Sequence, residues 1–295
     1  MRRPAAVVLA QADLVRSIAA YQDGIPYAIS ALDHVWKTTA TFRRVGSLGL
    51  GFRFEIAGVE RSHATLHLHA VDHRFPMHWA MLHGRDDDCI AWAAHFTSTL
   101  LALDAFQPSA VTCAACYGRA RVVHWLLDHG FYMTSQSIVQ AVLYGDVALV
   151  ALLCERAPTM VPAHVLAAAA ARGHMEVARY LHAHFPRTLR SGGVLSAAVT
   201  APTNAEAMVC FVHRVFRGLR PTARDISLAL CQDNLPLLST VLDLFDPPIT
   251  SSDTYFALTH EHARDHPETT ALLIRRCAAL GLPTALASVN IVDSH

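Results

Sequence analysis

The chain has 295 residues, of which 53% are hydrophobic and only 16% are charged, a composition that excludes an intrinsically disordered protein. Lys plus Arg and Asp plus Glu both number 24, so no overall field favours binding to nucleic acid or to an anionic membrane. Aromatic residues make up 8% of a sequence rich in alanine, which favours close-packed helices over a β-sandwich. We therefore expect an all-α protein of one large or two ordinary domains.

Neither end nor middle of the sequence predicts a targeting or membrane segment. The most apolar run, residues 161–171, is about half of the ~20 residues that span a bilayer, and it contains His164. The apolar stretch after Pro4 is too short for a signal peptide and is interrupted by Gln11 and Asp13. Seven scattered cysteines do not describe a disulfide framework. We expect a cytoplasmic protein.

Residues 1–50 predict two helices, over 14–21 and 28–36, that lie outside the periodic pattern described below. Their apolar spacing resembles that of an F-box, which has Leu-x-x-Ile-x-x-Tyr-Leu and later Leu-x-x-Val-x-x-x-Trp. The opening Leu-Pro is absent, and the spacing from Leu32 to Trp36 is compressed. Two hypotheses stay open: a helical cap, or an F-box-like segment that recruits a ubiquitin ligase through a cullin-ligase adaptor.

Residues 51–73 predict a β-hairpin, because residues 52–56 and 64–70 alternate with period two around a turn at 58–62. Histidines concentrate here and just beyond, and two of those on one strand face could bind zinc. No cysteine or acidic residue stands at a diagnostic spacing, so we predict a solvated polar face and no metal site. The histidines are His63, His67, His69, His73, His78 and His83.

Three segments of the following region align without gaps around Gly118, Gly145 and Gly173, which are 27 and then 28 residues apart. Small residues precede each glycine, and an apolar helical face follows it. We read each segment as a first helix, a glycine that ends it in a left-handed conformation, and a second helix. One pair is too thin to bury its own apolar face, so successive pairs must stack.

This pattern resembles the ankyrin repeat, whose signature runs Thr-Pro-Leu-His-x-Ala-Ala-x-x-Gly-His. Residues 75–84 match it at Pro76, His78 and Gly84, and Gly173-His174 matches its end. The resemblance implies an ankyrin-like stack of about seven helix pairs over residues 74–285, followed by a tail over 286–295.

The period departs from that of the family, which is about 33 residues and includes a β-hairpin finger between helix pairs. A spacing of 27 to 28 residues predicts short connections and little or no finger. Compact repeats of this kind resemble those of large DNA viruses of amoebae and of some protists, which would imply the host cytoplasm as the place of action.

In the ankyrin family, partners often contact the residues just before the helix-ending glycine. Carried to this sequence, the resemblance implies binding to a protein partner through His83, Tyr117, Tyr144, Arg172 and Gln232. Tyrosine and arginine are enriched in binding hot spots. The alternative for the tyrosines is packing against the next repeat.

No motif predicts catalysis or a cofactor. Cys113 and Cys116 form a lone Cys-x-x-Cys inside a predicted helix, with no second pair to complete a metal site. No Gly-x-Ser-x-Gly, His-Glu-x-x-His or phosphate-binding loop occurs. We therefore expect a protein–protein interaction module and not an enzyme.

Overall fold

In the computed structural model, the described residues are 29, 30, 32, 34, 42–47, 52–56, 66–68, 74–104, 109–189, 192–244 and 267–279. They form a helical protein of many short, paired helices. The chain divides into two compact units, Met1–Tyr144 and Gly145–His295. No helix among these residues is long and apolar enough to cross a membrane.

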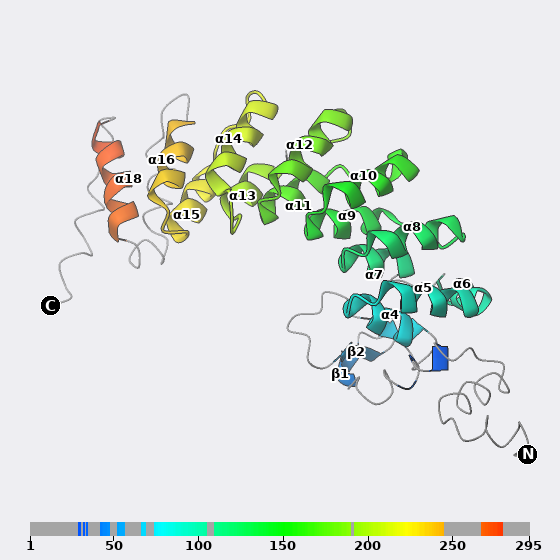
Figure 1. Cartoon of the computed structure of the whole chain (residues 1–295). Coiled ribbons are helices and arrows are strands. Elements are labelled where there is room, and N and C mark those ends of the chain that lie inside the picture. The colour runs from blue at the N-terminus through cyan, green and yellow to red at the C-terminus, as the bar shows by residue number, and fades with distance from the viewer. Residues whose placement is uncertain are drawn as a thin grey trace, which may run out of the picture. The chain divides into compact units, whose positions relative to one another are not determined.

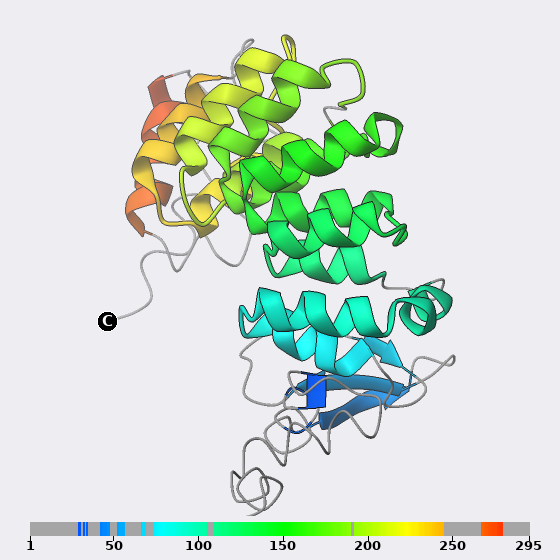
Figure 2. The same cartoon turned by 45° about the vertical axis from the view of Figure 1, so that its right-hand side comes forward.

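The first unit contains a small antiparallel sheet of order β1–β2–β3, which lies beside α4 in Figures 1 and 2. The strands β2 (Phe52–Ile56) and β3 (Leu66–Leu68) are antiparallel neighbours within the two segments expected to form a hairpin. The strand β1 (Phe42–Ser47) pairs with the other edge of β2, with a shift of register between Arg44 and Gly46. No strand was predicted over residues 42–47, so the extended region begins earlier than the sequence indicated.

The helices of the first unit form two pairs, α4–α5 and α7–α8, joined by α6 and followed by α9. Successive elements pack directly: α4 on α7, α5 on α8, and α7 on α9. Figure 2 shows these pairs as successive layers. Their bounds are α4 (Arg74–Leu82), α5 (Asp86–His95), α6 (Thr97–Asp104), α7 (Ala110–Cys116), α8 (Ala120–Asp128) and α9 (Ser135–Tyr144).

The helices of the second unit continue the alternation of first and second helices. First helices pack on first helices, α11 on α13 and α13 on α15, and second helices do the same, α10 on α12, α14 on α16 and α16 on α18. Their bounds are α10 (Val147–Arg156), α11 (Val165–Arg172), α12 (Met175–His184), α13 (Val194–Val199), α14 (Ala205–Val215), α15 (Ala223–Cys231), α16 (Leu235–Asp243) and α18 (Pro267–Ala279).

Small side chains permit the close approach of first helices, as the sequence indicated. Ala114 on α7, Ala141 on α9 and Ala169 on α11 each have 0% of their surface exposed. On the second helix α8, Val122, Val123 and Leu126 are also 0% exposed. Burial of each such aliphatic side chain contributes roughly 1.5–3 kcal/mol. Within each unit, the core therefore lies between the helices of a pair and between successive pairs.

The connections from one pair to the next are short and contain no strand in the parts that the structure describes. The chain from α8 to α9 has a turn and extended residues, and that from α10 to α11 contains a 3-10 turn, η1 (Pro158–Met160). The spacing from Gly84 to Gly118 is longer than the others because α6 is inserted between α5 and α7. That extra helix was not predicted from the sequence.

Buried polar contacts join the N-terminal turns of neighbouring first helices at the third residue of each helix. In the first unit, the hydroxyls of Thr112 on α7 and Ser137 on α9 are 2.8 Å apart and buried. In the second unit, Ser196 Oγ on α13 donates to Asp225 Oδ1 on α15 at 2.6 Å. Each buried hydroxyl or carboxylate thus has a partner, as burial of a polar group requires.

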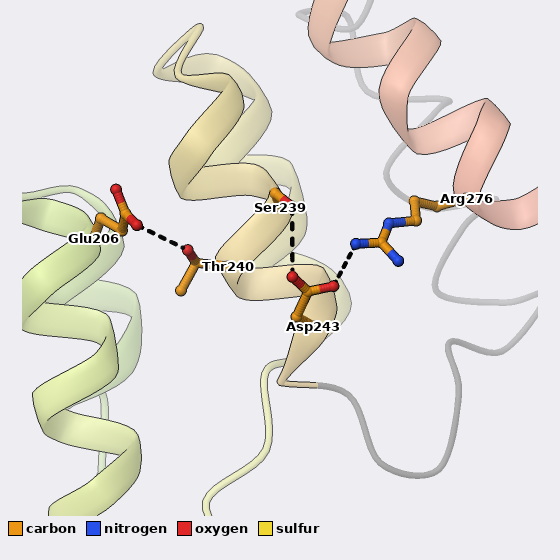
Figure 3. A network of polar contacts seen from close by, with 5 residues as sticks. All are labelled: Glu206, Ser239, Thr240, Asp243 and Arg276. Atoms are coloured by element: carbon orange, nitrogen blue, oxygen red, sulfur yellow. Dashed lines mark hydrogen bonds and ion pairs between the residues drawn. The ribbon is translucent and has the colours of Figure 1, made fainter.

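Charged and hydroxyl side chains link the second helices on the exposed side of the second unit. Thr240 Oγ1 on α16 donates to Glu206 Oε1 on α14 at 3.4 Å (Figure 3). Asp243 at the end of α16 forms an ion pair with Arg276 on α18. Exposed pairs of this kind contribute about 0–1 kcal/mol each, so they align the helices more than they stabilise them.

Candidate partner-binding site

The candidate site is built on the turn that ends each first helix. Gly84, Gly118, Gly145 and Gly173 have φ values of +71°, +67°, +94° and +71°. After α7, the Gly118 N–H donates to the Ala115 carbonyl at 3.1 Å and the Arg119 N–H to the Ala114 carbonyl at 2.9 Å. This is the Schellman arrangement, and the predicted role of these glycines is confirmed.

Two later turns use other residues in the left-handed conformation. Asn204, before α14, has φ +55°, and Asp233, before α16, has φ +48°. Asparagine and aspartate tolerate this region better than other side chains do. Asp233 directly follows Gln232, the C-cap of α15, so an aspartate takes the place of the glycine there. Asn204 is instead the N-cap of α14 and lies beyond the end of α13 at Val199.

Each of the four glycines is covered by a side chain or backbone group of the following pair. A Cβ added to Gly118 would lie 2.1 Å from the Tyr144 ring, and one added to Gly145 would lie 2.5 Å from the His174 ring. The nearest atom is 3.2 Å away at Gly84, in Arg119, and 2.1 Å away at Gly173, in Thr203. All four glycines are thus favoured by their φ, and Gly118, Gly145 and Gly173 also by the close approach of the next pair.

We define the ladder face as the set of five residues that the sequence predicted to bind a partner, and each unit's share of it is a set of its own. His83, Tyr117 and Tyr144 belong to the first unit, and Arg172 and Gln232 to the second. Tyr144 is 52% exposed, and His83, Arg172 and Gln232 are also exposed. Tyr117 is half-buried, and this burial raises the pKa of its phenol. Four of the five side chains are therefore accessible, and the fifth is partly covered.

Local packing holds the aromatic members of the ladder face in place. The imidazole of His83 lies 4.5 Å from the Trp79 ring between centroids, at an interplanar angle of 41°. Arg85 lies over the same Trp79 ring, with its Cζ 5.3 Å from the ring centroid. Tyr144 rests on Gly118 while half of its surface faces solvent. Tyr144 thus packs on the preceding pair, whereas the alternative predicted packing against the next repeat, and it still exposes half of its surface.

A second set of residues at these turns was not anticipated from the sequence. Arg119 Nε donates to the Met81 carbonyl at 2.6 Å, and Asn204 Nδ2 donates to the Gly173 carbonyl at 3.2 Å. Both residues open the second helix of one pair and cap the first helix of the pair before it. Carbonyls at a helix C-terminus carry partial negative charge, so such donors are stabilising there. The sequence feature that could have revealed these two residues is the polar residue that recurs just before each second helix.

The other candidate sites of the sequence have less support. Among the described residues, no group of three or more His, Cys, Asp or Glu side chains is placed to hold a metal ion. His63, His69 and His73 lie outside those residues, while His78 is buried in α4. Cys113 is buried, and burial raises the pKa of its thiol and of the Cys116 thiol, which disfavours the reactive thiolate.

The F-box-like hypothesis concerns residues that lie almost entirely outside the described part of the chain. Of the residues that carry the resemblance, the structure describes Ile29 and Leu32, both helical and buried. The first helix of the last expected pair, near residues 255–258, is outside it as well. Comparison of the sequence with family models and with curated proteins found no match.

Proposed function

We propose that the chain is a compact ankyrin-like repeat protein that binds another protein through its ladder face. The observation that carries the proposal is the placement of Tyr144. Its ring is fixed over Gly118 by packing, yet it is 52% exposed. A large, amphipathic and already ordered side chain contributes contact area at low entropic cost, which is typical of binding surfaces.

Two further features support the proposal. His83 and Tyr144 stand at equivalent positions of the first unit, each at or beside the end of a first helix and each held by local packing. In the second unit, Arg172 and Gln232 occupy equivalent ends of α11 and α15 and are exposed. Aromatic and arginine side chains in this arrangement are the types that dominate interface energetics. The role is that of an interaction module and includes no catalytic step.

The test is affinity capture with the full chain, comparing the wild type with variants that spare the fold. Arg172→Ala removes an exposed side chain, and Tyr144→Phe keeps the ring on Gly118 while it removes the hydroxyl. Tyr144→Ala removes the ring. Arg179→Ala, on the exposed side of the second helix α12, is the matched control.

We expect a defined protein to be retained by the wild type and by Arg179→Ala, and to be lost or weakened at least tenfold by Arg172→Ala and Tyr144→Ala. The melting temperature of Arg172→Ala should stay within a few degrees of the wild type, since substitution of an exposed residue changes stability by about 0.5 kcal/mol or less. Retention of every captured protein by all three ladder-face variants would contradict the proposal.

A further inference from the structure

Positive charge is distributed unevenly along a chain whose formal net charge is zero. Residues 177–224 contain seven arginines, no lysine and one acidic residue, Glu206. The rest of the chain therefore has six more acidic than basic side chains. This stretch runs from α12 to the start of α15 and contains six more basic than acidic side chains.

Most of these arginines stand at two connections between helix pairs. We define the arginine edge as one arginine between α12 and α13 together with the four that flank the connection from α14 to α15. All five are exposed. They are Arg187, Arg214, Arg217, Arg220 and Arg224.

The two connections lie at the same end of neighbouring helices. They lead into α13 and α15, which pack against each other. The N-terminal turns of these helices are joined directly, because Ser196 Oγ donates to Asp225 Oδ1 at 2.6 Å. The arginines of both connections therefore gather at one edge of the second unit.

Stability does not account for these arginines. Arg214 lies in the last turn of α14, where a cation is favourable, but Arg224 is the second residue of α15, where it meets the positive end of the helix dipole. The acidic neighbour Asp225 is 2% exposed and is engaged by the Thr222 N–H and hydroxyl at 2.7 and 2.8 Å. Among the described residues, no ion pair neutralises any member of the arginine edge.

We propose that the arginine edge binds an acidic segment, a run of aspartate and glutamate residues, of the partner protein. The planar guanidinium group can donate two parallel hydrogen bonds to one carboxylate, and several in a row match a run of carboxylates. This inference rests on the proposed function, in that the anionic ligand is taken to be protein.

Nucleic acid is a poorer match to the same surface. Binding of single strands without sequence preference uses exposed aromatic rings on which bases stack, whereas Phe185 and Phe216, the rings at the two connections, are half-buried. Duplex binding uses a longer run of phosphate contacts than two connections supply.

The experiment measures fluorescence anisotropy of a labelled decaglutamate peptide with the full chain at low salt. The test variant is Arg217→Glu/Arg220→Glu. Two single variants that change the net charge equally serve as a matched pair: Arg220→Glu inside the arginine edge and Arg275→Glu outside it. Arg275 is exposed on α18, away from the arginine edge in sequence and element. A labelled decathymidylate serves as the nucleic-acid probe.

We expect decaglutamate to bind the wild type, and the double variant to raise Kd at least tenfold. Arg220→Glu should weaken binding several-fold and Arg275→Glu less than twofold. Equal weakening by the matched pair, or absence of binding at 50 mM salt, would overturn the inference. Tighter binding of decathymidylate, lost in the same double variant, would overturn it in favour of nucleic acid.

The peptide-binding experiment and the capture experiment with ladder-face variants can fail independently of each other. Decaglutamate binding should be unchanged by Arg172→Ala and Tyr144→Ala. Arg172 lies at the C-terminal end of the first helix α11, whereas the arginine edge lies at the N-terminal ends of α13 and α15, and Tyr144 belongs to the first unit. Failure of decaglutamate to bind leaves the dependence of the captured partner on the ladder face intact, and failure of the ladder-face variants leaves the peptide result intact.

Discussion

The ring of Tyr144 lies over Gly118 so closely that a Cβ at position 118 would be 2.1 Å from Cε1 and Cζ of the ring. Gly118 also has φ +67°, a conformation that L side chains rarely adopt. Gly118 thus has two roles: it adopts the conformation that ends α7, and it leaves room for the Tyr144 ring of α9.

The first prediction concerns Gly118→Ala. The left-handed backbone costs an alanine about 1–2 kcal/mol. Displacement of the Tyr144 ring should add to that cost, because no atom can remain at 2.1 Å. We expect a loss of about 2–4 kcal/mol in the free energy of unfolding, measured by urea denaturation.

Gly130→Ala is the matched control, because Gly130 has φ +81° and nothing within 4 Å of a Cβ. It should cost only the backbone part, about 1–2 kcal/mol. The Gly118→Ala/Tyr144→Ala double variant should lose less stability than the sum of the losses of the two single variants. The reason is that the added Cβ no longer meets the Tyr144 ring. Equal losses for Gly118→Ala and Gly130→Ala would show that the Tyr144 contact has no energetic consequence.

The second prediction concerns Arg119, which reaches back to the end of α4. Its Nε donates to the Met81 carbonyl at 2.6 Å and its Nη2 to the Leu82 carbonyl at 3.4 Å. Arg119→Ala should cost about 1–3 kcal/mol, because hydrogen bonds from charged donors to part-buried carbonyls are lost. Thermal and urea unfolding report the change.

Arg121→Ala is the control two residues away. Arg121 forms an ion pair with Asp87 at 2.5 Å between side chains that are 65% and 82% exposed. Its removal should change stability by less than about 1 kcal/mol. A larger loss for Arg121→Ala than for Arg119→Ala would contradict the assignment of Arg119 as the helix cap.

Sequence patterns predicted the paired helices because the pattern is local. A helix-ending glycine, a small residue four positions before it and an apolar face after it each act within one or two turns of chain. Gly118, Gly145 and Gly173 adopt the expected φ for that reason. The cap of α7 is equally local, because Ser109 directly precedes the helix and its Oγ accepts from the Thr112 N–H.

The sequence did not reveal contacts between pairs, because these join residues about 30 positions apart whose side chains vary. Arg119, Tyr144, His174 and Thr203 all cover the preceding glycine, and they share neither charge nor size. What recurs is a place beside the turn and not a residue type. Strand β1 was missed for a related reason. Its extended conformation is stabilised by pairing with β2, and its own sequence does not predict a strand.

The third prediction concerns Asp225, which is 2% exposed and caps α15 in a reciprocal box with Thr222. It also accepts the hydrogen bond from Ser196 on α13. Asp225→Ala should cost about 2–4 kcal/mol, from the lost cap and from part-buried donors left without an acceptor. Glu206→Ala, which removes an exposed carboxylate, should cost less than about 1 kcal/mol, and comparable losses for the two would refute a special role for Asp225.

The last prediction concerns the pH dependence contributed by Asp104, which is 5% exposed at the end of α6. Burial raises the pKa of this carboxyl, an effect only partly opposed by the Ala110 and Tyr132 N–H groups that donate to it at 2.7 and 2.8 Å. A raised folded pKa means that the folded state binds the proton more tightly than the unfolded chain, whose pKa is about 3.9. The stabilisation from that proton is therefore complete below about pH 4 and is lost as the pH rises through the folded pKa.

Asp104→Asn cannot titrate, so it isolates this contribution. The difference in unfolding free energy, wild type minus Asp104→Asn, should fall as the pH is raised from about 4 and then level off above the folded pKa. Urea denaturation at a series of pH values measures the difference, with Asp87→Asn, an exposed carboxylate on α5, as the control. A difference that rises with pH would mean that the two N–H donors outweigh burial and hold the pKa of Asp104 below its unfolded value.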